Sequence, residues 1–150
     1  MRSEQISTSS LLQRLFKTNH LGRFIRHYEK QLDSVTFSEY INQLCAYRGV
    51  APAQIIKKSN IERTFGHQLF NGRRTPSRDK VIQLAFGFEM DYDETQALLK
   101  TACKSPLYPK VKRDAVVIYA LKRGFGIMEV QATLDELSLP LLGKDERKYD

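Results

Sequence analysis

The stretch NIERTFGHQLFNGRRTPSR, residues 60–78, combines an apolar helical spacing with a cluster of arginines. Its apolar side chains recur at intervals that place them on one face of a helix: Ile61, Phe65, Leu69 and Phe70. The other positions are polar, and three arginines follow shortly after the last apolar residue. Guanidinium groups bind phosphate and other anions through paired hydrogen bonds. The stretch therefore favours a helix with a buried back that holds an anionic partner.

The residues that usually carry catalysis or bind metals form no recognisable motif. The three histidines are scattered, at His20, His27 and His67, and the chain has no glycine-rich phosphate loop, nucleophile elbow or paired acid motif. Two cysteines, Cys45 and Cys103, are too few and too far apart for a zinc site, and Cys45 falls on an apolar stripe that predicts a buried, inert thiol. We therefore expect no enzyme, no metal and no cofactor.

The positive charge is unevenly distributed along the chain, whose net charge is +7 at pH 7. Lys and Arg against Asp and Glu number 6 against 3 in residues 1–34, 8 against 4 in residues 35–90 and 10 against 10 in residues 91–150. The whole excess thus lies in the first ninety residues. Such an asymmetry points to a polyanionic partner, most commonly nucleic acid, although a merely solvated basic surface has the same composition.

Helical periodicity runs through nearly the whole chain, and no segment shows sustained strand alternation, so we expect an all-α protein. In the N-terminal part, a Ser9-Ser10 capping signal precedes a group of apolar residues: Leu11, Leu12, Leu15 and Phe16. An amphipathic stripe follows at helical spacing: Leu21, Phe24, Ile25, Tyr28 and Leu32.

Further helices are predicted where a capping residue or a helix-tolerated proline precedes an apolar period. They are expected from Phe37 to Gly49, from Pro52 to Ser59, from Glu62 to Phe70, after Ser77, after Asp91 or Asp93, and over RDAVVIYALKR and GIMEVQATLDEL. The pair Arg113-Asp114 is interpreted as a charge pair at a helix start. We find no internal repeat and no low-complexity segment.

The predicted helices Pro52–Ser59 and Glu62–Phe70 are joined by only a few residues, a layout typical of a helix-turn-helix. Here the sequence VAPAQIIKKSNIERTFGHQLFNGRRTPS resembles the lambda-repressor-like (XRE or Cro type) helix-turn-helix transcriptional regulator family without a gap. Ile55 stands for the buried leucine of the first helix, Asn60 for the turn glycine and Ile61 for the buried residue after it. LFNG matches the end of the recognition helix, and GRRTP matches the G-R-x-x-P loop. The resemblance covers about residues 37–88.

The resemblance implies a lambda-repressor-like five-helix DNA-binding domain over residues 35–104. Residues 1–34 would then form an N-terminal amphipathic arm, residues 105–143 a C-terminal helical extension packed on the same core, and residues 144–150 a frayed tail. The second helix of the pair would enter the major groove of double-stranded DNA. The resemblance thus implies a sequence-specific regulator of transcription.

The family pattern also implies which side chains touch DNA. The exposed residues of the recognition helix begin with Glu62, and those expected to read bases are Arg63, Thr64, His67, Gln68 and Asn71. Arginine can pair with guanine O6 and N7, and the amides of Gln and Asn can pair with adenine. Phosphate contacts are expected from Gln54, Lys57, Arg73, Arg74 and Arg78.

Two positions depart from the family pattern. Ser59 stands where the family usually buries a leucine, and Gly66 stands where it usually buries a branched aliphatic residue. Phe65 could supply the missing volume. Alternatively Gly66, which costs about 1 kcal/mol of helix propensity relative to alanine, permits a close backbone approach.

Regulators of this family usually bind an inverted-repeat operator as dimers, with half-sites about 34 Å apart. We expect RDAVVIYALKR to complete the core and the arm to serve dimerisation or partner binding through residues 11–32. The alternative function is a protein-interaction adaptor or antitoxin-like module that uses the helix-turn-helix scaffold without sequence-specific DNA binding.

No apolar run reaches the roughly 18 residues of a membrane span, and the N-terminus lacks a secretory apolar region, so a cytoplasmic protein is expected.

Overall fold

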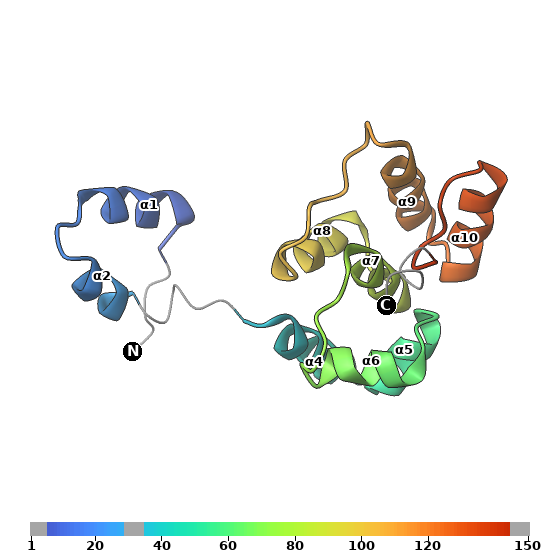
Figure 1. Cartoon of the computed structure of the whole chain (residues 1–150), viewed down its shortest axis with the longest axis horizontal. Helices are drawn as coiled ribbons and strands as arrows, with labels where there is room; N and C mark the ends of the chain where they lie inside the picture. Colours follow the sequence, from blue (N-terminus) through green and yellow to red (C-terminus); the bar gives the residue numbers. More distant parts are fainter. Residues whose placement is uncertain (1–5, 29–34, 145–150) are drawn as a thin grey trace. The chain divides into compact units, whose positions relative to one another are not determined.

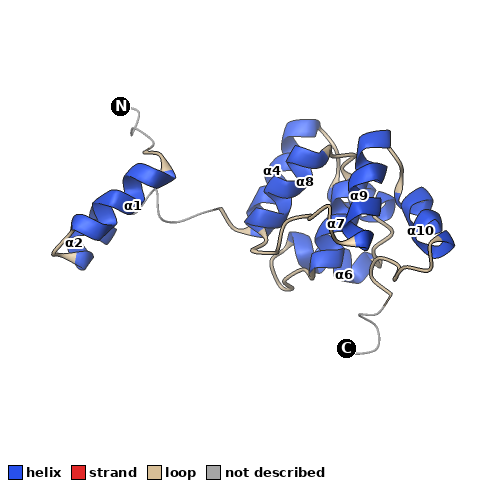
Figure 2. Ribbon diagram, turned by 90° about the horizontal axis from the view of Figure 1, so that it is seen from above, coloured by secondary structure: helices blue, strands red, loops and turns tan. Residues whose placement is uncertain are grey.

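The computed structural model describes residues 6–28 and 35–144, and every regular element in these residues is a helix (Figure 2). The prediction of an all-α protein is therefore confirmed for the described part of the chain. The chain divides into two compact units, residues 1–35 and residues 36–150, each of which we describe by itself. No helix among the described residues is long and apolar enough to cross a membrane.

The N-terminal unit holds two short helices, α1 (Thr8–Lys17) and α2 (Leu21–His27). The side chain of Ser7 caps α1 by accepting a hydrogen bond from the backbone N–H of Ser10, so the expected Ser9-Ser10 cap is wrong by two residues. Of the predicted apolar stripe, Phe24 and Tyr28 are buried against each other, with ring centroids 4.7 Å apart. Several other apolar side chains of this unit are exposed: Leu12, Leu15, Phe16, Leu21 and Ile25. Leu32 lies outside the described residues.

The larger unit contains the other helices of the described chain, and Figure 1 shows them gathered around α7. They are α4 (Phe37–Arg48), α5 (Pro52–Lys58), α6 (Arg63–Phe70), α7 (Arg78–Gly87), α8 (Tyr92–Thr101), α9 (Lys112–Arg123) and α10 (Ile127–Glu136). Every residue of α7 from Val81 to Gly87 is buried, which makes this helix the centre of the core.

The helix ends follow from local chemistry, mostly as the sequence predicts. Thr36, Ser77 and Asp91 each accept a hydrogen bond from a backbone N–H one turn into their helices. Gly49 ends α4 with a φ of 65°, a left-handed conformation that glycine adopts without strain. Cys45 lies in the core, where burial raises the pKa of its thiol, as expected of an inert cysteine.

Residues 78–108 and 113–143 are two copies of one helical hairpin, so the expectation of no internal repeat is wrong. At an offset of 35 residues, α7 aligns with α9 and α8 aligns with α10 without a gap. The identical pairs include residues that make matching contacts in the two copies: Arg78 and Arg113, Asp79 and Asp114, Gln96 and Gln131, and also Glu94 and Glu129, which each accept from the N-cap backbone N–H of their own helix.

The arginines and aspartates of the two copies form a reciprocal pair of ion pairs. Arg78 donates to both carboxylate oxygens of Asp114 at 3.0 and 2.8 Å, and Arg113 donates to both carboxylate oxygens of Asp79 at 2.8 Å each. Each arginine also donates to two backbone carbonyls at the end of its own hairpin. Arg113-Asp114 is therefore not a local pair at a helix start, because both side chains bind partners on α7.

The two aligned glutamines, Gln96 and Gln131, also make equivalent hydrogen bonds in the two hairpins. The side-chain amide of Gln96 exchanges two hydrogen bonds with the backbone of Leu107, and that of Gln131 does the same with Leu142. This network is unchanged when the two hairpins are exchanged, as expected of an approximate two-fold axis between them. The hairpins thus close on each other, and residues 105–143 share one core with the preceding helices.

Candidate nucleic-acid interface

The short connection between α5 and α6 fixes how these two helices cross. Asn60 adopts a φ of 56°, a left-handed conformation that asparagine tolerates better than most residues, at the position where the family resemblance places a glycine. Ile61 then turns into the core. Ser59 is fully buried, and its hydroxyl donates to the carbonyl of Ile55 at 2.7 Å, so that no polar group is stranded.

Gly66 lets α6 lie directly against α5. A Cβ at position 66 would come within 2.5–3.0 Å of three side-chain carbons of Ile56, closer than real Cβ contacts allow. Ile56 therefore fills the volume that a branched aliphatic residue at position 66 would occupy. Phe65 remains half-buried, so the close-approach interpretation of Gly66 is the correct one.

Glu62 caps the start of α6. Its carboxylate accepts hydrogen bonds from the backbone N–H groups of Thr64 and Phe65, at 2.9 and 2.8 Å. These two bonds lower the pKa of Glu62 below its usual value. The role of Glu62 is thus to start the helix, and the first residue with helical geometry is Arg63.

The outward face of α6 carries most of the side chains expected to read bases. Leu69 and Phe70 are buried behind it, while Thr64 and Asn71, seven positions apart, point most directly away from the core. His67 and Gln68 lie between them and are half-exposed. Arg63 is exposed at the flank of the same helix. The structure brings all five candidates, Arg63, Thr64, His67, Gln68 and Asn71, onto one short helix and its C-cap.

Two of these candidates have hydrogen bonds that limit how they could read a base. The side-chain oxygen of Gln68 accepts from the Nε of Arg74 at 3.0 Å, and that of Asn71 accepts from the backbone N–H of Arg73 at 2.9 Å. A bidentate pair with adenine needs both the oxygen and the NH2 group of the amide. In this arrangement Gln68 and Asn71 offer NH2 donors, which suit the purine N7 or the guanine O6.

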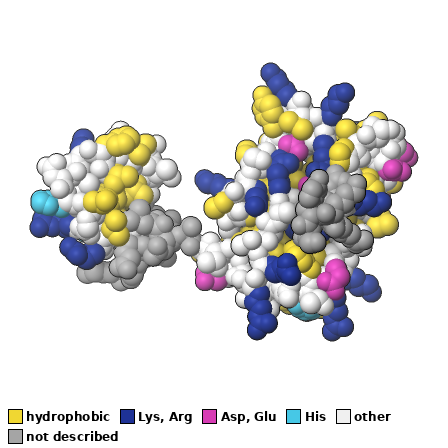
Figure 3. All heavy atoms as spheres, in the orientation of Figure 1, with side chains coloured by type: hydrophobic (Ala, Val, Ile, Leu, Met, Phe, Trp, Pro, Cys, Tyr) yellow, Lys and Arg dark blue, Asp and Glu magenta, His cyan; other side chains and the backbone are white. Residues whose placement is uncertain are grey.

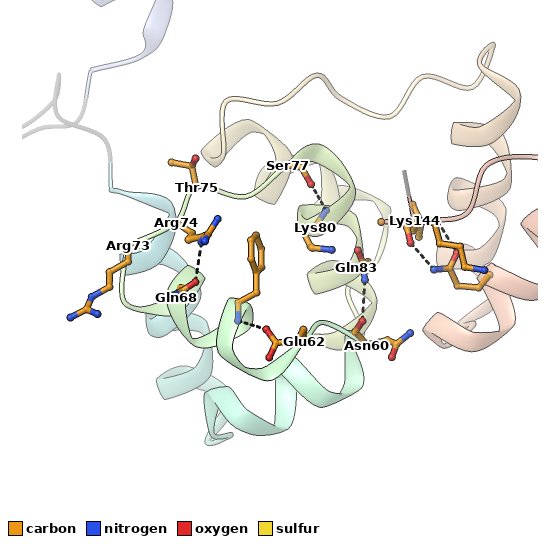
Figure 4. Close-up of a pocket in the computed structure, with 14 residues that line it drawn as sticks. Asn60, Glu62, Gln68, Arg73, Arg74, Thr75, Ser77, Lys80, Gln83 and Lys144 are labelled. Carbon is orange, nitrogen blue, oxygen red and sulfur yellow. Dashed lines mark hydrogen bonds between the residues drawn. The ribbon is translucent and has the colours of Figure 1, made fainter. Parts of the chain in front are cut away.

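A cationic hollow lies beside α6, bordered by the loop after it, by α7, by Gln131 of α10 and by residues 142–144, and the one carboxylate among its described lining residues is that of Glu62 (Figure 4). Its volume is about 1030 Å³, and cations line it together with amide and hydroxyl groups: Arg74, Lys80, Lys144, Gln68, Thr75 and Ser77. The ring of Phe65 lies under two of the cations, 5.4 Å from the guanidinium of Arg74 and 5.6 Å from the ammonium of Lys80. The hollow therefore offers positive charge and hydrogen-bond donors to an anion.

Other residues that line the hollow, Arg73 and Gln83 among them, differ in whether their side chains face into it. Figure 4 shows Arg73 pointing away from the hollow, whereas Arg74 lies over it. Gln83 donates to the carbonyl of Ser59 at 3.2 Å, and its side-chain oxygen is buried without a donor among the described residues. Lys80 is not among the residues that the family pattern indicates. Its position three residues after the Ser77 cap, just past the G-R-R loop, was the available signal.

Arg78 does not belong to this surface, although the family pattern suggests a phosphate contact. Its guanidinium donates to Asp114 and to the carbonyls of Ser105 and Pro106. These bonds use the donor groups that would meet a phosphate, and the side chain is mostly covered, so we correct this assignment. The other arginines of the loop, Arg73 and Arg74, are exposed.

The remaining phosphate candidates lie on α5. Lys57 is exposed, and Gln54 is exposed while its side-chain oxygen accepts from the backbone N–H of Ala51, which leaves the NH2 group as a donor. Figure 3 shows Lys and Arg side chains projecting from the lower edge of the larger unit, where Figure 1 draws α5 and α6. Gln54 and Lys57 thus add exposed donors on the helix that packs against α6.

Within the described residues, no group of His, Cys, Asp and Glu side chains is arranged to hold a metal ion. Compared with protein-family models, with curated proteins and with solved structures, the chain matches none. The functional assignment therefore depends on the geometry of α5, α6 and the loop after them.

Proposed function

We propose that the chain is a sequence-specific DNA-binding regulator of transcription, with α5 and α6 as a lambda-repressor-like helix-turn-helix. In this proposal α6 lies in the major groove of double-stranded DNA. Arg63, Thr64, His67 and Gln68 contact base edges, together with Asn71 at the end of the helix. Arg73, Arg74, Gln54 and Lys57 contact the flanking phosphates.

One observation carries the proposal: α6 is anchored by a buried back and presents an outward polar face that runs directly into two exposed arginines. Leu69, Phe70 and the Gly66–Ile56 contact hold the helix rigidly, so that its outer side chains have a fixed register. Rigid support matters because base readout needs hydrogen bonds of defined geometry.

The cationic hollow favours the same partner. Arg74 and Lys80 lie beside α6 on the side of the following loop, where a phosphate of the flanking backbone would sit when the helix occupies the groove. The excess of positive charge in residues 35–90 supplies the longer-range attraction.

The test is base preference in two variants of the outer face. We expect Arg63→Ala and Gln68→Ala each to relax the preference at one operator position, by about 1–3 kcal/mol. Lys100→Ala, which removes an exposed cation from α8, is the control and leaves every preference unchanged. Unaltered preference at all positions in both variants would remove α6 as the recognition helix.

A second candidate function is suggested by the N-terminal unit. Its exposed apolar side chains, which include Leu15, Phe16 and Leu21, suit a partner helix better than solvent. They would serve either as the dimer contact of a regulator or as the binding face of an adaptor or antitoxin-like module. Deleting residues 1–32 separates these roles: a regulator becomes monomeric and loses operator affinity, whereas an adaptor loses its protein partner and has no operator to lose.

A further inference from the structure

The approximate two-fold relation of the two hairpins makes the outer faces of α7 and α9 equivalent. The face of α7 is covered by α5. A Cβ on Gly87 would lie 1.9 Å from the hydroxyl of Ser59 and 2.9 Å from the carbonyl of Ile55, which shows how closely α5 approaches there. Gln83, one turn earlier, donates to the carbonyl of Ser59. This face of α7 is thus a helix-docking face with its helix in place.

The equivalent face of α9 has no helix on it among the described residues of this unit. Thirty-five residues after Gln83, Leu84 and Gly87 stand Ile118, Tyr119 and Lys122. The three residues of α7 are buried, whereas Ile118 is only half-buried and Tyr119 is 51% exposed. With their neighbours they form a groove of about 540 Å³, here named the α9 groove, lined by Pro109, Ala115, Ile118, Tyr119, Lys122 and Arg123.

The chemistry of the α9 groove differs from that of its counterpart in a way that indicates its partner. Ile118 stands in place of Gln83, which makes the floor of the groove more apolar. Lys122 stands in place of Gly87, so its side chain would hold a docked helix at the usual separation of packed helices rather than at the close approach that glycine permits. The guanidinium of Arg123 lies 5.1 Å from the ring centroid of Tyr119. No described acidic residue lines the groove, and two further exposed lysines, Lys110 and Lys112, precede and begin α9. The groove is an apolar floor with a basic rim.

We propose that the α9 groove docks an acidic amphipathic helix of a partner protein. Apolar side chains of such a helix would lie on Ile118 and Tyr119, and its carboxylates would meet Lys122 and Arg123. A tyrosine at the centre of a groove is a frequent anchor of helix binding. This surface is distinct from α6 and does not depend on the proposed DNA contact.

Charge argues against the other occupants that the chain itself offers. Two α9 grooves packed on each other would place Lys122 and Arg123 of one copy near the same cations of the other. The N-terminal unit has exposed apolar side chains, but its described helices carry Arg14, Lys17, Arg23 and Arg26 and no acidic residue. An acidic partner complements the rim, whereas these basic ones repel it.

The experiment measures binding of the full chain to three labelled helical peptides by fluorescence anisotropy. The peptides are about 20 residues long, which suits stable helix formation, and share one Leu/Ile stripe. Their polar faces carry Glu, Gln or Lys. We expect the Glu peptide to bind most tightly and the Lys peptide most weakly.

Three variants then locate the site. Ile118→Ser is expected to weaken the Glu peptide about tenfold without changing net charge. Lys122→Glu with Arg123→Glu is expected to weaken it at least fivefold and to make the Lys peptide the preferred one. Lys100→Glu, on α8, changes charge outside the groove and is expected to leave the order and the affinities nearly unchanged. Circular dichroism and thermal unfolding confirm that each variant is folded.

Three results would overturn the proposal. Equal binding of all three peptides would show that the floor takes any apolar helix, and loss of Glu-peptide binding in Lys100→Glu to the same extent would show diffuse attraction to a basic protein. Concentration-dependent self-association that Ile118→Ser abolishes would make the groove an interface between two copies.

Discussion

Replacing Arg78 and Asp114 together distinguishes a structural ion pair from a DNA contact. Asp114 is 4% exposed, and besides Arg78 it accepts only the backbone N–H of Tyr108 among the described residues. Arg78→Met alone therefore strands a buried carboxylate. We expect a loss of about 3 kcal/mol in the free energy of unfolding and a fall in Tm of about 10 °C.

The double variant Arg78→Met/Asp114→Leu removes both charges and fills the site with apolar groups. Because apolar replacement of a whole buried ion pair is often nearly neutral, we expect it to recover about 2 kcal/mol relative to the single variant. It also keeps the net charge of the protein unchanged. Urea unfolding followed by circular dichroism measures both values, and equal losses in the two variants would contradict the ion-pair interpretation.

The same double variant tests whether Arg78 meets DNA. Affinity for duplex DNA is measured over a range of salt, since each phosphate contact contributes about 0.9 to the slope of log affinity against log salt. We expect Arg74→Met to lower the slope by about that amount, and we expect no change in the double variant or in the charge control Lys100→Met. A double variant whose slope falls as far as that of Arg74→Met would return Arg78 to the interface.

Other predictions concern packing and ionisation. Gly66→Ala is expected to cost about 1–3 kcal/mol despite a better helix propensity, because its Cβ would overlap Ile56, and Ile56→Ala in the same chain should recover part of that loss. Gly87→Ala is expected to cost more than Gly66→Ala, since its Cβ would meet Ser59 and a backbone carbonyl that cannot move aside. For Asp79, burial opposes ionisation, but the hydrogen bonds from Arg113 and Gly143 outweigh it and hold its pKa below the usual value. The ionised carboxylate of Asp79 thus stabilises the fold above the unfolded-state pKa of about 3.9, and this contribution is lost as pH falls through the lower folded-state pKa. In Asp79→Asn, we therefore expect the free energy of unfolding to fall less steeply as the pH is lowered through this range.

The helices were predictable from the sequence because their signals are local. Thr36, Ser77 and Asp91 cap helices within three residues of themselves, and Gly49 ends one by its own conformation. The polar outer face of α6 also follows from spacing within one helix. At Gly66 the family pattern indicates that a branched aliphatic side chain is missing, but only the structure shows that Ile56 fills its place.

The remaining features depend on residues far apart in the chain. Nothing near Arg78 reveals that its partner is Asp114, thirty-six positions away. The duplication is hard to recognise in the sequence because the two hairpins share few identical residues. Where α5 covers α7, Gln83, Leu84 and Gly87 correspond to the different residues Ile118, Tyr119 and Lys122 of α9. Gln96 and Gln131 form hydrogen bonds with backbone groups rather than with side chains. Their equivalent roles therefore leave no sign in the spacing of apolar residues along the sequence.

Selection of tight binders from a random duplex DNA pool, followed by a salt titration of the selected sequence, tests the central claim most directly. The account predicts an enriched inverted repeat with half-sites about one helical turn apart, whose affinity falls steeply as salt rises. Binding without any enriched sequence would contradict it, because the outer face of α6 would then be part of a basic surface that reads no bases.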